Sequence, residues 1–255
     1  EDANTGVISS IEDRQNYIIR KSVNLSKEAH IVACNIDRAF LVVTLDRPKT
    51  SLGFIDRFLV TADAYNIPVT LLFNKIDQYD EELMEEMEWM EDMYAFCGYD
   101  SMRIEAVNGV GIDAVRARML DKISLVSGHS GVGKTTLINQ LVPGLNLKTA
   151  EVSDSHNKGK HTTTFAEMHK LPEGGWIIDT PGVKGFGLVD IPKEELHHHF
   201  PEIFRLLADC KFHNCLHLNE PGCAVREAVE KTELPEERYR NYLAMYHEDD
   251  GPYRS

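Results

Sequence analysis

The sequence predicts an α/β fold built around a largely parallel β-sheet, and two observations lead to this prediction. Apolar runs of strand length alternate with longer segments of helical periodicity over residues 39–182, a pattern typical of βαβ units. A glycine-rich segment directly follows one of these runs and opens into a helical segment, which is how phosphate-binding loops are built. The 255 residues, 42% hydrophobic and 27% charged, allow one large domain or two to three small ones.

The first segment of the chain predicts β structure. Residues 5–22 alternate apolar and polar side chains, which predicts two short antiparallel strands around a turn near residues 13–16. Two strands alone are only marginally stable. We therefore expect this segment to be the end of a small β-domain whose first strands are absent from the chain.

The alternation that follows predicts the main domain. The expected elements, in chain order, are strand 39–45, helix 54–65, strand 68–73, helix 80–92, a strand and a helix within 101–120, strand 122–128, helix 134–142, strand 165–171 and strand 176–182. In the acidic segment 80–92, Leu83, Met87 and Met90 recur at helical spacing, which predicts an amphipathic helix with a solvated acidic face. Its carboxylates lack the loop spacing and the glycine of a calcium site.

The pattern changes after Pro192. Helical periodicity at 194–210 leads into a short segment rich in Cys and His, and two further helices are expected at 224–231 and 235–246. No apolar run is long enough for a transmembrane helix, and the N-terminal residues lack the basic and apolar regions of a signal peptide. We therefore expect a cytoplasmic protein that does not enter membranes.

The glycine-rich segment at 128–135, GHSGVGKT, fits the phosphate-binding pattern G-x-x-x-x-G-K-[ST]. Its glycines let backbone N–H groups point at phosphate oxygens, and the helix that follows adds its N-terminal dipole. Lys134 is expected to contact the β- and γ-phosphates, and the Thr135 hydroxyl to ligate Mg²⁺. The expected nucleotide contacts in this segment are Gly128, His129, Ser130, Gly131, Val132, Gly133, Lys134, Thr135 and Thr136.

Two further segments complete a triphosphate site. Asp179 ends an apolar strand and precedes Thr-Pro-Gly, so it is expected to contact Mg²⁺ directly or through water, and the Gly182 N–H to sense the γ-phosphate. In the polar linker before this strand, one threonine is expected to close over the γ-phosphate and Mg²⁺. Thr163 is the preferred residue and Thr162 the alternative.

The stretch Asn74-Lys75-Ile76-Asp77 predicts the base that is bound. The Asp77 carboxylate is able to accept hydrogen bonds from guanine N1–H and the 2-amino group, whereas adenine offers no matching pair of donors. Lys75 is expected to lie across the base plane, and Ala106 is a further expected contact. GTP and GDP are therefore favoured over adenine nucleotides.

The base-reading segment precedes the phosphate loop, which is the reverse of the order in ordinary GTPases. Because sheet contacts do not depend on where the chain termini lie, we interpret this order as a circular permutation of a P-loop GTPase domain. The permutation joins strand 176–182, which would sense the γ-phosphate, directly to the C-terminal segment. Such a connection suits a switch that reports the nucleotide state.

The C-terminal cluster Cys210-x4-Cys215-x-His217-x5-Cys223 predicts one structural Zn²⁺, because three thiolates and an imidazole make a tetrahedral ligand set. His213 lies nearby as a fifth candidate. Residues 197–199 are three consecutive histidines on a predicted helix, so they cannot all face one metal, and we expect them at the surface or in an interface. Cys34 and Cys97 are expected to be buried thiols.

Together these motifs resemble the small-ribosomal-subunit-dependent GTPase A family, known as RsgA or YjeQ, over nearly the whole chain. The resemblance rests on NKID, GHSGVGKTTLIN, GKHTTT, DTPGVKGFGL and the Cys/His set. It implies the end of an OB-fold at 1–33, a permuted GTPase domain at 34–192 and a small, mainly helical zinc domain at 193–255. It also implies GTP hydrolysis late in the assembly of the small ribosomal subunit, stimulated by that subunit. We expect a monomer that binds the subunit and its rRNA.

The resemblance also bears on catalysis. Val183 cannot orient the attacking water, and the resemblance implies His161 for that role; a solvent-exposed loop histidine is the alternative. The residues expected to take part in hydrolysis are thus Lys134, His161, Asp179 and Gly182. A net charge of −14 makes the chain a poor general binder of nucleic acid, so rRNA contacts are hypothesised at local basic residues: Arg14, Arg20, Lys21, Arg47, Lys49 and Lys184.

Two other functions fit parts of the sequence. A P-loop GTPase that matures metal centres would use the Cys/His cluster as a transfer site. A nucleotide-gated RNA-binding scaffold would hydrolyse little GTP, and the intact Lys134, Thr135 and Asp179 argue against it.

Overall fold

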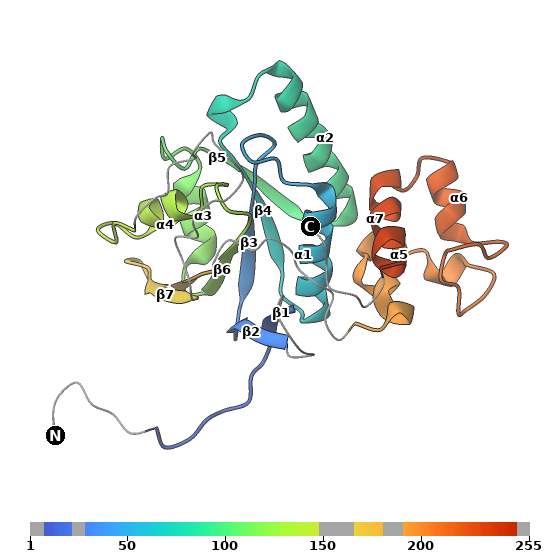
Figure 1. Ribbon diagram of the computed structural model, residues 1–255, viewed down its shortest axis with the longest axis horizontal. Helices are drawn as coiled ribbons and strands as arrows, with labels where there is room; N and C mark the ends of the chain where they lie inside the picture. Colours follow the sequence, from blue (N-terminus) through green and yellow to red (C-terminus); the bar gives the residue numbers. More distant parts are fainter. Residues whose placement is uncertain (1–7, 22–28, 148–165, 181–190, 249–255) are drawn as a thin grey trace.

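A six-stranded β-sheet forms the centre of the computed structural model, which describes residues 8–21, 29–147, 166–180 and 191–248 (Figure 1). The strand order is β5-β4-β3-β6-β8-β7, and only β7 runs antiparallel to its neighbour. The strands are β3 (Arg38–Val43), β4 (Val69–Asn74), β5 (Asp100–Ile104), β6 (Ile123–Ser127), β7 (Glu167–Lys170) and β8 (Trp176–Asp179). The largely parallel sheet predicted from the sequence is confirmed.

Helices cover both faces of this sheet. They are α1 (Leu52–Ala64), α2 (Glu81–Cys97), α3 (Ile112–Met119) and α4 (Lys134–Leu141), with a short 3₁₀ turn η1 (Ile76–Gln78) after β4. Successive side chains of a strand point to opposite faces. Leu41 of β3 therefore joins the core beneath α1 and α2, whereas Phe40 joins the core beneath α3 and α4.

The first two strands differ from the expected hairpin. β1 (Tyr17–Lys21) pairs antiparallel with β2 (Ala29–Cys34), and residues 8–16 form no strand, so the predicted turn near 13–16 is wrong. The apolar residues that suggested an earlier strand are left in solvent, with Ile8 81% and Ile11 89% exposed. Alternation alone does not make a strand when no partner edge is available.

The C-terminal segment packs against α1. It comprises η2 (Lys193–His199), α5 (Pro201–Phe204), η3 (Leu207–Asp209), α6 (Ala224–Glu230) and α7 (Glu236–Tyr246). The single helical stretch expected at 194–210 is broken into three short pieces, and Pro201, which lacks the N–H that a continuing helix needs, explains the break between η2 and α5. Val60 of α1 shares a core with Phe200 and Tyr242, and Figure 1 shows these helices beyond α1 on one side of the sheet. In the described part of the chain, no helix has the length and apolarity needed to span a bilayer.

Candidate nucleotide site and metal centre

The segments predicted to bind nucleotide meet at one edge of the sheet. β3, β4, β6 and β8 are parallel neighbours, so the loops that follow them emerge at the same edge. β3 lies between β4, which leads into the base-reading segment, and β6, which leads into the phosphate loop. The order along the chain is reversed, but the two loops lie where one nucleotide would need them.

Two glycines of the phosphate loop allow a backbone that other residues would not. Gly128 has φ of 147°, and a Cβ there would lie 2.6 Å from the carbonyl oxygen of Val42. Gly133 has φ of 100°, and a Cβ there would collide with the Asn74 side-chain amide. Glycine is therefore required for the loop to approach both neighbouring strands closely.

Lys134 is the first residue of α4 and directly follows the phosphate loop glycine Gly133. Its side chain is buried, and the ammonium donates to the carbonyl oxygens of Gly128 (2.7 Å) and His129 (2.6 Å). Burial lowers the pKa of Lys134 to about 8, and the charge of Asp179 opposes this shift. A phosphate would give this ammonium a second anionic partner.

Asn74 joins the two halves of the site. Its side chain is 1% exposed. The amide nitrogen donates to the Val132 carbonyl in the phosphate loop (2.8 Å), and the amide oxygen accepts from the Ala106 N–H (3.0 Å). Asn74 therefore holds the phosphate loop and the Ala106 loop together, and its expected contact with the base stays a prediction. The expected contact between Ala106 and guanine stays a prediction.

Lys75 and Asp77 lie at the end of β4, beside the loop that follows β3. Lys75 adopts φ of 66°, and its ammonium donates to the Arg47 carbonyl (2.5 Å). Partial burial lowers the pKa of Lys75, while the charges of Asp46 and Asp77 oppose that shift. Asp77 is exposed, so its carboxylate is accessible to a base.

Residues 45–54 make contacts to both loops that were not expected from the sequence. The Phe54 ring stacks on His129 of the phosphate loop with centroids 3.7 Å apart. The Tyr79 hydroxyl accepts from the Leu45 N–H (2.9 Å) and donates to the Asn74 carbonyl (2.8 Å). The position of strand 39–45 could have predicted these contacts. The loop that follows a central parallel strand emerges at the edge of the sheet where ligands bind.

The remaining expected triphosphate contacts are only partly described. Asp179 ends β8 and is 3% exposed, and Thr180 donates its hydroxyl to the Val126 carbonyl (3.0 Å). Ser130, Thr135 and Thr136 lie in the phosphate loop and first turn of α4 and are not buried. Gly182, His161, Thr162 and Thr163 lie outside the described residues.

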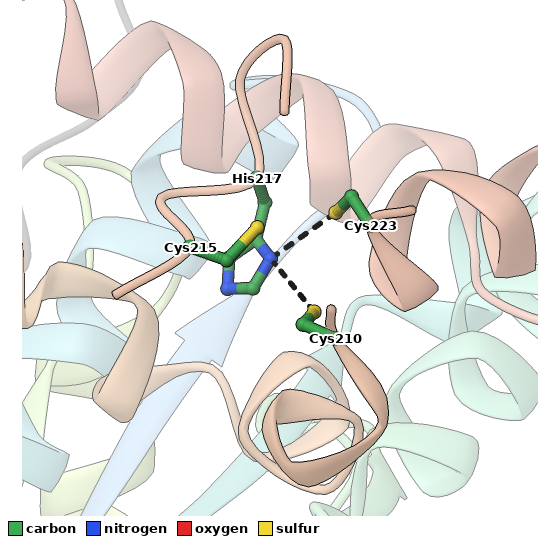
Figure 2. Close-up of side chains that lie close together, drawn as sticks. All are labelled: Cys210, Cys215, His217 and Cys223. Carbon is green, nitrogen blue, oxygen red and sulfur yellow. Dashed lines mark hydrogen bonds between the residues drawn. The ribbon is translucent and has the colours of Figure 1, made fainter. Parts of the chain in front are cut away.

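The four expected zinc ligands converge in the C-terminal segment (Figure 2). The ligand atoms of Cys210, Cys215, His217 and Cys223 all lie within 4.8 Å of one another. His217 Nδ1 is 3.7 Å from the Cys210 sulfur and 3.3 Å from the Cys223 sulfur. Tetrahedral Zn²⁺ with Zn–S bonds of about 2.3 Å places neighbouring ligands about 3.5 to 3.8 Å apart, so the geometry fits this ion.

The chemistry of the cluster also fits a divalent cation. Burial raises the pKa of Cys215 to about 12 and also raises that of Cys223, so thiolates here depend on a positive ion for stabilisation. Glu220, which the sequence analysis missed, shapes the ligand loop by accepting from the backbone N–H groups of Leu216 (2.8 Å), Leu218 (2.7 Å) and Asn219 (3.0 Å).

Other histidines lie outside this ligand set. His213 is exposed and is not part of the cluster. Of the three consecutive histidines, His198 is exposed and His199 pairs with Asp63 of α1 at 2.9 Å. His197 is buried against the His217 ring, with centroids 5.2 Å apart, so of the two expected positions, surface or interface, the surface one is wrong for this residue. His197 thus packs beside His217 of the candidate metal site.

Comparisons with known proteins agree with this geometry. A family model described as RsgA GTPase matches residues 11–189. The chain is 55% identical to the small ribosomal subunit biogenesis GTPase RsgA of Bacteroides fragilis over 252 residues, which cover 98% of this chain and 81% of that protein. It is 51% identical to the protein of the same name from Flavobacterium psychrophilum, covering 100% of this chain and 78% of that protein.

Solved structures show the same similarity. The crystal structure of YjeQ from Thermotoga maritima matches with a TM-score of 0.77 and 35% identity, covering 97% of this chain and 80% of that one. The crystal structure of YloQ, described as a circularly permuted GTPase, matches with a TM-score of 0.75 and 28% identity, covering 96% of this chain and 76% of that one. The circularly permuted GTPase fold predicted from the order of the motifs is confirmed.

Proposed function

The chain belongs to the RsgA GTPase family, and on that premise we propose that it hydrolyses GTP as a late assembly factor of the small ribosomal subunit, which stimulates the hydrolysis. The observation that carries the proposal is the bridge made by Asn74, whose amide ties the phosphate loop to the Ala106 loop beside the base-reading segment. The phosphate loop and the base-reading segment are therefore held in place together, ready to bind one nucleotide.

Within this proposal each part of the site has a role. Lys75 and Asp77 recognise guanine, Lys134 holds the phosphates, and Thr135 and Asp179 hold Mg²⁺, which would neutralise phosphate charge when bound. Gly182 senses the γ-phosphate, Thr163 closes over it, and His161 orients the attacking water.

The rest of the chain completes the proposed factor. Residues 1–33 are the end of an OB-fold, and residues 193–255 are a domain held by Cys210, Cys215, His217 and Cys223 around structural Zn²⁺. Four protein ligands leave no open position, which favours a structural site over metal transfer. We place the protein in the cytoplasm as a monomer that contacts the rRNA of the small subunit.

The deciding experiment is steady-state GTP hydrolysis with the protein alone, with purified small subunits and with purified large subunits. Stimulation of about tenfold or more by the small subunit only, lost in Lys134→Ala, is the expected result. A rate that no subunit changes would overturn ribosome-stimulated hydrolysis and favour a binding scaffold.

A further inference from the structure

A cleft of about 270 Å³ lies between α2 and the loop that joins α6 to α7. We call it the α2–α7 groove. Its lining residues are Trp89, Asp92, Met93 and Phe96 from α2, and Thr232, Glu233, Pro235 and Glu237 from the loop and the start of α7. The α2 residues recur at intervals of three and four, so they share one face of the helix. The groove is thus built by both the GTPase core and the C-terminal segment.

The groove exposes aromatic surface. Trp89 is 42% and Phe96 51% exposed, seven positions apart on the same helix face. The Arg205 guanidinium lies 5.9 Å from the Phe96 ring and donates to the Phe96 carbonyl (3.1 Å). Exposed aromatic side chains in a recess with a polar rim are typical of a protein-binding surface, where Trp often contributes most of the affinity.

The rim of the groove is acidic. Asp92 of α2 and Glu233 and Glu237 of the loop and α7 line it, and α2 contains neither Lys nor Arg. Among the described residues, Asp92, Glu233 and Glu237 form no ion pair within 4.0 Å; Lys231 pairs with Glu227 (2.6 Å) and is attracted only at longer range by Glu233. Negative potential of this kind repels phosphate and attracts lysine and arginine. Charge complementarity therefore favours a basic polypeptide over rRNA.

We propose that the α2–α7 groove binds a lysine- and arginine-rich segment of a small-subunit protein that inserts an apolar side chain between Trp89 and the α6–α7 loop. The source of the segment rests on the proposed function. Proteins that neutralise rRNA phosphates are themselves basic, so an acidic factor gains attraction to the subunit by binding its proteins. The chain's charge of −14 then favours association instead of opposing it.

The first test measures binding of a fluorescein-labelled lysine peptide with one leucine, by anisotropy on the full chain. Trp89→Ala and the double variant Asp92→Lys/Glu233→Lys should each weaken binding by about tenfold or more. The matched control is Glu167→Lys/Glu173→Lys, which makes the same change in net charge at β7 and its turn, on the opposite edge of the sheet. It should change binding by less than about twofold.

Equal weakening in the two double variants would mean non-specific attraction to net charge and would overturn the proposal, as would no binding by the unmodified chain. Loss of the leucine from the peptide should reduce binding to the unmodified chain but not to Trp89→Ala. Unchanged thermal unfolding and basal GTP hydrolysis of each variant establish that it is folded.

The second test identifies the source of the segment. A photo-crosslinking benzoylphenylalanine at position 89 is irradiated with purified small subunits and a non-hydrolysable GTP analogue. Crosslinks to a basic segment of a subunit protein are expected; crosslinks to rRNA alone, or none in a complex that co-sediments, would overturn the assignment. If the unmodified chain fails to co-sediment with the subunit, the proposed function fails, and the peptide result still decides the chemistry of the groove.

Discussion

Asn74 connects two loops of the nucleotide site through one side-chain amide, and this makes a direct test at the scale of a residue. Asn74→Ala removes both hydrogen bonds and leaves the Ala106 N–H and Val132 carbonyl unpaired. Each buried unpaired group costs about 1–3 kcal/mol, so GTP affinity should fall by about tenfold or more. Calorimetric titration with GTP measures this loss.

Asn16 provides the matched control for Asn74. Its amide makes the same pair of bonds, to the Ile36 carbonyl (2.8 Å) and N–H (2.7 Å), away from the nucleotide site. Asn16→Ala should lower stability but leave GTP affinity unchanged. Equal GTP affinities in the two variants would contradict the role assigned to Asn74.

Asp77 determines the base in our assignment. Asp77→Asn replaces one acceptor with a donor, so it should reduce GTP affinity by about a hundredfold and favour xanthosine triphosphate, which presents a matching acceptor. Competition between the two nucleotides measures the change. Asp80→Asn is the control, because Asp80 caps α2 through the Leu83 N–H (3.0 Å) and Asn caps equally well. Unchanged selectivity in Asp77→Asn would remove the base-reading assignment.

Lys134 links nucleotide binding to pH. Burial lowers its pKa to about 8 in the nucleotide-free protein, and a bound phosphate favours the charged form. Near and above pH 8, nucleotide binding is therefore accompanied by the uptake of a proton. The affinity for nucleotide should fall by at most about tenfold per pH unit above about pH 8. Titrations in buffers with different ionisation enthalpies measure the uptake, which should vanish in Lys134→Met. Binding without proton uptake near that pH would contradict the shifted pKa.

At the scale of secondary structure, α1 connects the nucleotide site to the C-terminal segment. Phe54 near its start stacks on His129, and Asp56, two residues later, pairs with Arg238 of α7 at 2.5 Å. Arg238 is fully buried and also pairs with Glu202 of α5 at 2.7 Å. The two carboxylates raise the pKa of Arg238 against the opposing effect of burial, so the guanidinium stays charged.

Replacing Arg238 tests this connection. Arg238→Met leaves two carboxylates buried without a cation, which should cost about 3–5 kcal/mol of unfolding free energy. Burial already raises the pKa of Asp56. Without the Arg238 cation, the pKa of Asp56 rises further. As the pH falls through this raised pKa, the folded state binds more protons than the unfolded state, so the variant should regain stability.

Chemical denaturation at several pH values measures both effects. Arg240→Met is the control, because Arg240 is exposed and pairs with Glu236 one turn away. Its stability should change by less than about 1 kcal/mol. If both variants lose the same stability, the buried network is not what holds α7 to α1.

At the scale of the whole molecule, the proposed zinc site is expected to stabilise the C-terminal segment. Cys223→Ser should bind less than stoichiometric zinc and unfold at a lower temperature, because metal binding contributes folding free energy and each kcal/mol lost lowers the midpoint by about 2–4 °C. Strong chelators should give the same shift in the unmodified chain. Cys34→Ser, a change outside the ligand set, should do neither; zinc retained in full by Cys223→Ser would contradict the assignment.

Local patterns made much of the fold and site predictable. The phosphate loop, the base-reading segment and the Cys/His set each occupy a short stretch whose spacing follows from the ligand bound. The helices and strands of the core were predictable because each carries its own apolar periodicity. Even the permutation could be inferred, because it is the order of these stretches along the chain.

Contacts between distant residues were decided by the tertiary structure alone. Examples are the pairing of β1 with β2, the stacking of Phe54 on His129, and the ion pair between Arg238 and Asp56, which lie 182 residues apart in the sequence. The α2–α7 groove likewise depends on how two segments pack. Sequence periodicity records which face of an element is apolar but not which other element covers it. The sequence by itself therefore determined which residues are candidates for the chemistry of this protein, and folding decided how the candidate nucleotide site, α1 and the Cys/His cluster are joined.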